Sequence, residues 1–342
     1  MKVVFCGLLN TGSKYFRRLR VIKLSLKLNS EHRDYNHIPV MLAESIEGLN
    51  ISNDGIYVDG TVGGGGHSKE IAARLSEKGR LICIDKDKDA HTAAEETLKG
   101  YKNVTFVHDD FSNINAILAS LGVSYINGAI LDLGVSSHQL DEAVRGFSFM
   151  QDARLDMRMD QGAGISAYNV VNEYSEKELA NIFFKYGEER FSRRIAELIV
   201  KERRNFPIST TLQLADIISS AVPKAAWEKN KNPATRVFQA IRIEVNNELN
   251  FLEQALEDFV GRLKPEGRLC VISFHSLEDR IVKNTFKKLE NPCECPRDLP
   301  ICVCGKKPVI KTITKRPISP TEDEIEKNIR CRSAKLRIIS KK

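Results

Sequence analysis

A glycine-rich stretch at residues 55–89 constrains the fold of this chain more than any other feature. A short apolar run ends in Asp59, four consecutive glycines follow at positions 63–66, and a second apolar run ends in Asp85. Between the glycines and the second run, apolar residues recur at helical spacing. Strand, glycine loop, helix and strand in this order are typical of a nucleotide-binding βαβ unit. Because glycine tolerates positive φ and lets the backbone approach a ligand, the loop predicts a cofactor site.

The same plan fits two cofactors, NAD and S-adenosylmethionine. A dinucleotide fingerprint sets a helix N-terminus against a pyrophosphate, but here Asp59 follows the first strand directly and would repel one. The same carboxylate suits the cationic sulfonium and amine of S-adenosylmethionine. Asp85 lies about 20 residues past the loop, where it can accept hydrogen bonds from both ribose hydroxyls. The residues favour S-adenosylmethionine, although a glycine loop can also be a simple tight turn.

Strand and helix patterns continue to alternate beyond this stretch. One further apolar run ends shortly before Phe111, and another ends in Asp132. This alternation predicts an α/β fold with a doubly wound, mostly parallel sheet. Ligands collect at the carboxyl ends of the strands in such sheets. We therefore expect Asp59, Asp85, Phe111 and Asp132 on one rim.

The alternation stops between residues 138 and 232, where only helical patterns appear. This predicts a helical domain, 138–232, inserted into an α/β domain formed by 35–137 and 233–342. After the insert we expect one long helix, about 234–263, followed by a strand. The tail at 334–339 alternates like an edge strand.

Basic residues gather at the two ends of the chain, which has 342 residues and a net charge of +7. Residues 1–30 hold seven Lys and Arg and no acid, and residues 306–342 hold twelve basic and four acidic residues. The segment 1–34 is a transit-peptide-like leader, an extended start or a disordered basic arm, and it is excluded from the fold. No apolar run approaches the ~20 residues of a membrane span. Because the basic residues gather at the two ends of the chain, RNA contacts must come from local basic patches.

The eight cysteines do not form the pattern of a disulfide framework. Cys83 and Cys270 lie in strand-like runs and are expected to pack as small apolar residues. The cluster C-x-C-x₆-C-x-C could bind zinc, yet structural zinc usually takes C-x₂₋₄-C pairs. Reduced thiols in a solvent-facing loop are the alternative, and the catalytic site is expected to contain no metal. The cysteines of this cluster are Cys293, Cys295, Cys302 and Cys304.

Several motifs occur together in the order known from one family. They are HIPVMLAE (37–44), YVDGTVGGGGHS (57–68), DLGVSSHQLD (132–141), RGFSF (145–149), PATRVFQAIRIEVNNEL (233–249), GRLCVISFHSLEDRIVK (267–283) and RSAKLR (332–337). On these motifs the chain resembles the RsmH (MraW) family, bacterial methyltransferases that modify a cytosine N4 in small-subunit ribosomal RNA. The resemblance implies a Rossmann-like class I fold that uses S-adenosyl-L-methionine, an insert that recognises RNA, a cytoplasmic location, and 16S ribosomal RNA of the 30S subunit as partner. It implies these cofactor contacts: Gly65, Gly66, His67, Asp85, Phe111, Asp132 and Gln139.

The chemistry of cytosine narrows the catalytic candidates. Methylation at C5 would need a cysteine nucleophile, and Leu133–Ser137, after the fourth strand, contains none. Asp132 is then either a cofactor contact or the acceptor of the amine proton, and the resemblance favours the first. His275 could orient the base or take a proton, or could simply cap the next helix. Phe147 or Phe149 could stack on the base or belong to the core.

Basic side chains of the insert and tail are the predicted RNA contacts, in particular Arg193, Arg194, Arg332 and Lys335. Two rival functions remain at this stage. A nicotinamide dehydrogenase would bind NAD in place of S-adenosylmethionine. A non-catalytic RNA-binding module would bind ribosomal subunits without needing Asp85.

Overall fold

The computed structural model describes residues 39–162, 164–227, 232–296 and 303–342. These residues belong to one compact unit, His37–Lys342. The predicted extension at 1–34 lies outside the described residues. Among the helices that are described, none is both long and apolar enough to cross a membrane.

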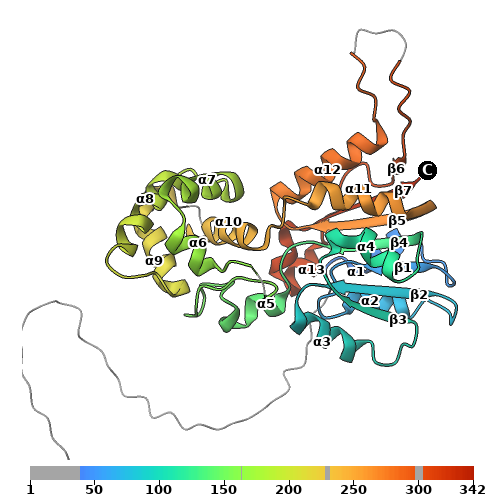
Figure 1. The fold of residues 1–342 in the computed structure, drawn as a ribbon, viewed down its shortest axis with the longest axis horizontal. Coiled ribbons are helices and arrows are strands. Elements are labelled where there is room, and N and C mark those ends of the chain that lie inside the picture. Colours follow the sequence, from blue (N-terminus) through green and yellow to red (C-terminus); the bar gives the residue numbers. More distant parts are fainter. Residues whose placement is uncertain (1–38, 163, 228–231, 297–302) are drawn as a thin grey trace, which may run out of the picture. The chain divides into compact units, whose positions relative to one another are not determined.

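Seven strands of the described residues form a single sheet in the order β3-β2-β1-β4-β5-β7-β6 (Figure 1). Neighbours from β3 to β5 pair in parallel, whereas β7 is antiparallel to both β5 and β6. This confirms the prediction of a doubly wound, mostly parallel sheet. The strands are β1 (Ile56–Asp59), β2 (Arg80–Asp85), β3 (Val104–His108), β4 (Ile126–Asp132), β5 (Leu263–Ser273), β6 (Ile310–Thr312) and β7 (Lys335–Lys341).

Helices cover both faces of the sheet because successive strand residues point to opposite sides. Along β1, Tyr57 joins one apolar cluster and Val58 joins another. The Tyr57 cluster contains side chains of α1, α2 and α3, and the Val58 cluster contains side chains of α4, α11 and α12. These helices are α1 (Leu42–Leu49), α2 (Gly66–Ala72), α3 (Lys88–Thr97), α4 (Ile114–Ser120), α11 (Leu252–Arg262) and α12 (Ser276–Glu290); α13 (Glu322–Lys327) precedes β7.

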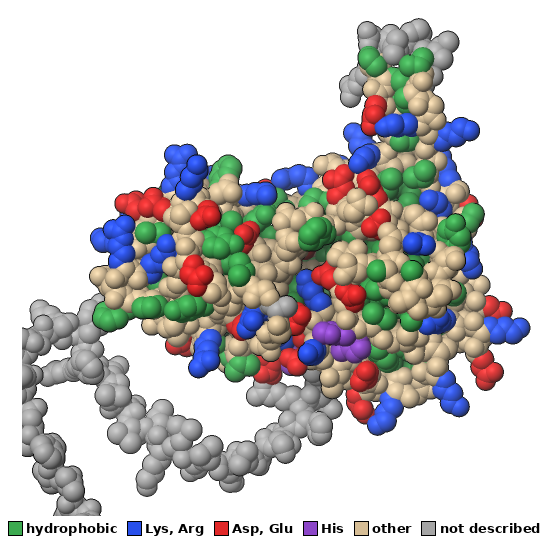
Figure 2. Space-filling model, viewed as in Figure 1, with side chains coloured by type: hydrophobic (Ala, Val, Ile, Leu, Met, Phe, Trp, Pro, Cys, Tyr) green, Lys and Arg blue, Asp and Glu red, His purple; other side chains and the backbone are tan. Residues whose placement is uncertain are grey.

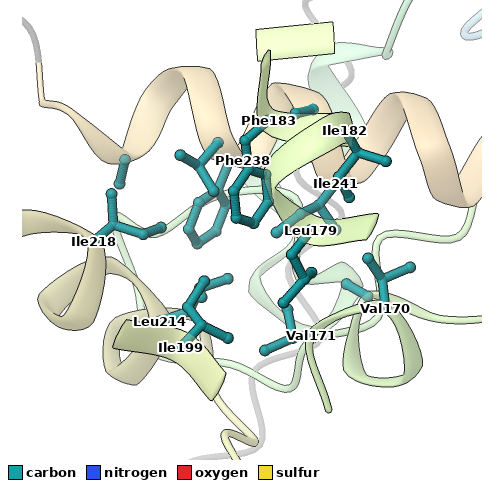
Figure 3. Close-up of a cluster of buried hydrophobic side chains, with 14 of the residues drawn as sticks. Val170, Val171, Leu179, Ile182, Phe183, Ile199, Leu214, Ile218, Phe238 and Ile241 are labelled. Atoms are coloured by element: carbon teal, nitrogen blue, oxygen red, sulfur yellow. The ribbon is translucent and has the colours of Figure 1, made fainter. Parts of the chain in front are cut away.

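The helical region between β4 and α11 has an apolar core of its own (Figure 3). Phe183 and Leu214 are fully buried there, and truncating such a phenylalanine to alanine typically costs about 3–5 kcal/mol. Capping boxes at Ser166, Ser175 and Thr210 fix where three of the helices begin. The helices are α6 (Ala167–Glu173), α7 (Glu176–Gly187), α8 (Ser192–Arg203), α9 (Thr211–Ala221) and α10 (Ala234–Asn246). The domain boundaries at 138 and 232 stay a prediction.

Two expectations about the C-terminal part are wrong. The single long helix at 234–263 is two helices, because Asn247 adopts a left-handed conformation with φ of 53° and ends α10. The tail strand is not an edge, because the three residues of β6 pair along its outer side. A strand of three residues is too short to show an alternating pattern in the sequence.

Candidate functional site

Three carboxylates end adjacent strands at one rim of the sheet. Asp59, Asp85 and Asp132 are the last residues of β1, β2 and β4, which lie side by side. The strand order reverses between β1 and β4, and this topological switch point is where open α/β sheets bind ligands. Phe111 begins the short 3₁₀ turn after β3 and lies against Gly60, where an added Cβ would be 3.2 Å from the Cβ of Phe111. The predicted convergence on one rim is therefore present.

The glycine loop is tied to the acid of the second strand. Gly63, with φ of 51°, donates its N–H to Oδ2 of Asp85 at 2.9 Å. Gly65 has φ of 82° and is the N-cap of α2, a conformation that an L side chain rarely adopts. At Gly66 a Cβ would collide with the ring of Pro39. The loop thus needs glycine for its own conformation and packing.

Asp85 is held in place and still has room to accept hydrogen bonds. Its Oδ1 accepts from the N–H of Asp87 at 2.9 Å, and its Oδ2 accepts from Gly63. Burial raises the pKa of Asp85, and these two N–H donors partly offset that effect. A carboxylate has about four lone-pair sites, so about two remain for hydroxyl donors.

The ionised form of Asp132 is disfavoured by burial and by two neighbouring acids. Within the described part of the chain, its Oδ1 is buried without a hydrogen-bond partner. Its Oδ2 lies 3.9 Å from Nδ1 of His67, whose Nε2 lies 3.0 Å from the carbonyl oxygen of Val40. Burial raises the pKa of Asp132 well above its usual value, and the negative charges of Asp59 and Glu278 raise it further. A cation bound here would relieve that repulsion.

Asp59 also ends a strand at this rim, but its side chain is buried. It is 2% exposed, and its two oxygens accept from the hydroxyl of Ser68 at 2.7 Å and the N–H of Thr61 at 3.2 Å. Burial raises the pKa of Asp59 to about 6, against the lowering effect of Ser68. The side chain is therefore enclosed by protein partners and can favour a cation only at a distance.

Gln139 belongs to a buried network that sequence reasoning did not find. Its amide nitrogen donates to Oδ2 of Asp87 at 2.6 Å, and its oxygen accepts from the N–H of Ser136 in the capping box of α5 (Ser137–Asp141). The guanidinium of Arg145 also meets Oδ2 of Asp87, at 2.9 Å, and Oδ2 of Asp89, at 3.0 Å. Arg145 is 2% exposed. The only sequence signal for it was its place in the RGFSF motif.

This network connects the helical region to Asp85, the predicted ribose contact. Arg145 also donates to the carbonyl oxygens of Arg158 and Met159 at 3.0 and 2.9 Å. Asp87, its ion-pair partner, donates its own N–H to Asp85. One buried guanidinium therefore links the segment before α6 to the loop that carries Asp85.

His275 is the N-cap of α12. Its Nδ1 accepts from the N–H of Glu278 at 3.4 Å, and its Nε2 lies 3.1 Å from Oε1 of the same residue. Oε2 of Glu278 accepts from the N–H of Phe274 at 2.8 Å. Burial alone would raise the pKa of Glu278, but its contact with His275, the positive charge of Arg242 and the N–H of Phe274 hold it below its usual value. Glu278 therefore stays charged and close to Asp132.

Glu248 lies beside His275 and Glu278, and the three side chains together could hold a metal ion. Ligand atoms of Glu248, His275 and Glu278 lie within 4.8 Å of one another. Both oxygens of Glu248, however, accept from the guanidinium of Arg242 at 2.9 Å. We interpret this group as an ion-pair network between the α10–α11 connection and α12.

The predicted RNA contacts differ in availability. Arg193, Arg194 and Arg332 are exposed, whereas Lys335 pairs with Asp279 at 3.2 Å. Figure 2 shows Lys and Arg side chains over the region of α7 and α8, interspersed with acids. Exposed Phe184 on α7 adds an aromatic surface there, with 67% of its area exposed.

The two phenylalanines considered for base stacking pack against protein. Phe147 is 6% exposed and belongs to the helical region's core. Phe149 makes an edge-to-face contact with Phe238, with ring centroids 4.9 Å apart. The geometry favours a packing role for both.

Comparison with known proteins identifies the family. The model of the MraW methylase family matches residues 34–342. This chain belongs to the MraW methylase family. "Ribosomal RNA small subunit methyltransferase H" of Clostridium botulinum strain Loch Maree is 58% identical over 308 residues, covering 90% of this chain and 99% of that relative, and the protein of strain Kyoto gives the same values. A solved rRNA methylase from Streptococcus thermophilus is 12% identical, with a TM-score of 0.36 over 88% of this chain and 93% of that one. The assignment rests on the sequence matches, and it leaves the dehydrogenase alternative without support.

Proposed function

We propose that this chain is a cytoplasmic S-adenosyl-L-methionine-dependent methyltransferase. Its proposed substrate is the N4 amine of a cytidine in 16S ribosomal RNA of the small subunit. The observation that carries the proposal is the group of acids at the switch point, where Asp132 keeps a buried oxygen without a partner in the described residues. The names of relatives that are 58% identical over nearly their whole length support the substrate class.

The residues present fit this cofactor. Its chemical contribution when bound is an electrophilic methyl group on a cationic sulfur. Asp132 and Asp59 favour that positive charge at the end of β4 and β1, and Asp85 offers its remaining lone pairs to two ribose hydroxyls. Phe111 offers a flat apolar surface beside the loop. Gly65, Gly66 and His67 shape the cofactor loop, while Gln139 acts through Asp87 to position Asp85.

The target amine requires alignment and a proton acceptor, and alignment supplies most of the rate. We assign Asp132 mainly to the cofactor, with the amine proton as its second role. Glu278, fixed by backbone N–H groups and close enough to influence Asp132, adds negative charge on the same side. His275 remains a predicted catalytic residue, and its contacts support a positioning role through Glu278.

RNA binding is proposed for the exposed face of α7 and α8 and for the tail. Arg193 and Arg194 can contact phosphates, and Phe184 can stack on an unpaired base. Arg332 lies in the segment before β7. The 30S subunit is the proposed form of the substrate.

A direct assay tests this function. The purified chain is incubated with isotopically labelled S-adenosylmethionine and with small subunits from a strain that lacks the gene. Nucleosides are then separated and identified by mass spectrometry. Labelled N4-methylcytidine in 16S RNA is expected, and Asp85→Ala serves as the cofactor-deficient control. Label only on cytosine C5, or only in the large subunit, would contradict the proposal.

A further inference from the structure

Two exposed segments between α12 and β6 hold a second group of reactive side chains. Residues 291–296 follow α12, and residues 303–309 lead into β6; we call them the two arms. Their described residues form no helix or strand. Figures 1 and 2 show the arms side by side as a narrow projection. None of their side chains belongs to the apolar clusters of the described residues, so the hydrophobic core does not hold them together.

Three thiols converge between the arms. The Sγ atoms of Cys293, Cys295 and Cys304 all lie within 4.8 Å of one another. In a tetrahedral thiolate site, Zn–S bonds of about 2.3 Å set neighbouring sulfur atoms ~3.8 Å apart. The arrangement therefore needs only a small contraction to reach zinc geometry. Cys302 lies outside the described residues.

The surroundings of these thiols resemble those of metal-bound thiolates. The N–H of Val303 in one arm donates to Sγ of Cys295 in the other, at 3.4 Å. Outer hydrogen bonds of this kind orient ligands and stabilise the thiolate form. Gly305, with φ of 66°, turns the chain immediately after Cys304.

Charge around the thiols is also favourable. Three thiolates and one divalent ion carry a net charge of −1, and exposed Lys306 and Lys307 follow the last ligand. Lys306 pairs with Glu294 of the other arm at 2.6 Å. Both partners of this pair are exposed, so it contributes little to holding the arms together. A metal ion held by thiols of both arms would connect them more strongly.

Cysteines elsewhere in the described chain have a different environment. Cys83, Cys270 and Cys331 are buried. Burial raises the pKa of the Cys270 thiol to about 12 and raises the pKa of the other two. These thiols resist ionisation and pack as apolar groups. The thiols of the arms, in contrast, are exposed or partly exposed.

We propose that Cys293, Cys295 and Cys304 bind one zinc ion that cross-links the two arms. Thiolate sulfur and tetrahedral geometry together select zinc among the common divalent ions. The C-x-C spacing is shorter than the usual pair spacing, but the convergence of the three sulfur atoms shows that it does not prevent ligation. The ion has a structural role in the loop between α12 and β6, apart from the methyltransferase site.

Metal analysis of the full-length protein tests this. The chain is purified under reducing conditions, and its metal content is measured by native mass spectrometry and elemental analysis. We expect about one zinc per chain, and loss of that zinc in Cys293→Ser/Cys304→Ser. Glu294→Gln is the matched control, since it breaks the exposed ion pair and leaves every thiol in place; it should retain zinc. Zinc retained by the double variant would overturn the proposal.

Cobalt substitution gives a second readout that does not depend on a variant. Zinc is removed by a chelator and replaced by Co²⁺ in the wild-type chain. Thiolate-to-metal charge-transfer bands and intense tetrahedral d–d bands are expected. Their absence, or a mass showing that these cysteines form a disulfide in the reduced preparation, would refute the site.

Discussion

Asp132→Asn should make the cofactor-free protein more stable while weakening cofactor binding. A buried acceptor without a partner costs about 1–3 kcal/mol, and more when it is charged. Asparagine keeps the size of the side chain and removes the charge. We therefore expect the free energy of unfolding to rise by about 1 kcal/mol at neutral pH. For a chain of this size, that corresponds to roughly 1–2 °C in Tm.

The pH dependence of this gain follows from the direction of the pKa shift. Burial and the charges of Asp59 and Glu278 raise the pKa of Asp132 in the folded state. The loss of stability that charged Asp132 causes in the wild type is therefore absent below the unfolded pKa of about 4, and it grows as pH rises. The stability gain of the variant should be largest near pH 8 and disappear in acid. Differential scanning calorimetry from pH 4 to pH 8 measures it.

Asp156→Asn is a matched control whose expected change in stability has the opposite sign. Burial alone would raise the pKa of Asp156, but hydrogen bonds from Arg158 lower it. Asp156→Asn should therefore lose stability at neutral pH, and that loss should fade as pH falls. If Asp132→Asn is less stable than wild type at pH 8, the electrostatic reasoning is wrong.

Kinetics of the same variant separate its two possible roles. With the cofactor role dominant, affinity for S-adenosylmethionine should fall about tenfold, or 1.4 kcal/mol, and kcat should change little. Calorimetric titration and steady-state assays give both values. A fall in kcat of about 100-fold or more with unchanged cofactor affinity would identify Asp132 as the general base instead.

Three further changes test other parts of the site. Asp85→Ala should weaken S-adenosylmethionine binding by about ten- to a hundredfold, because two charge-assisted hydrogen bonds are lost; unchanged affinity in a calorimetric titration would remove Asp85 from the site. Arg145→Lys keeps the charge but cannot contact both Asp87 and Asp89 with a planar guanidinium, so cofactor affinity should fall several-fold while binding to 30S subunits persists; equal cofactor affinity would show that the network does not position Asp85. Reversing the charges of Arg193, Arg194 and Arg332 to Glu should weaken subunit binding and lower its salt dependence while sparing cofactor affinity, as measured by filter binding across a salt series; full binding at physiological salt would place the RNA elsewhere.

The rim of the sheet was predictable because each acid directly follows an apolar run. Asp59, Asp85 and Asp132 need only strand positions to be placed, and parallel strands bring their carboxyl ends together. The pairing of Arg145 with Asp87 joins residues that are far apart in the chain and have no shared pattern. The break at Asn247 depends on one left-handed residue in an otherwise helical sequence. Local pattern thus revealed the strand ends, and tertiary contacts decided the rest.

The position of β7 has a consequence for synthesis of the protein. This strand, Lys335–Lys341, pairs with β5, which ends more than 60 residues earlier in the chain. Until β7 has left the ribosome, β5 has an open edge with Cys270, Val271 and Ile272 along it. Unpaired apolar edges favour association with other chains. The nascent protein therefore completes its sheet only after β7 has emerged from the ribosome, and chains that stop short of residue 335 should be prone to aggregate.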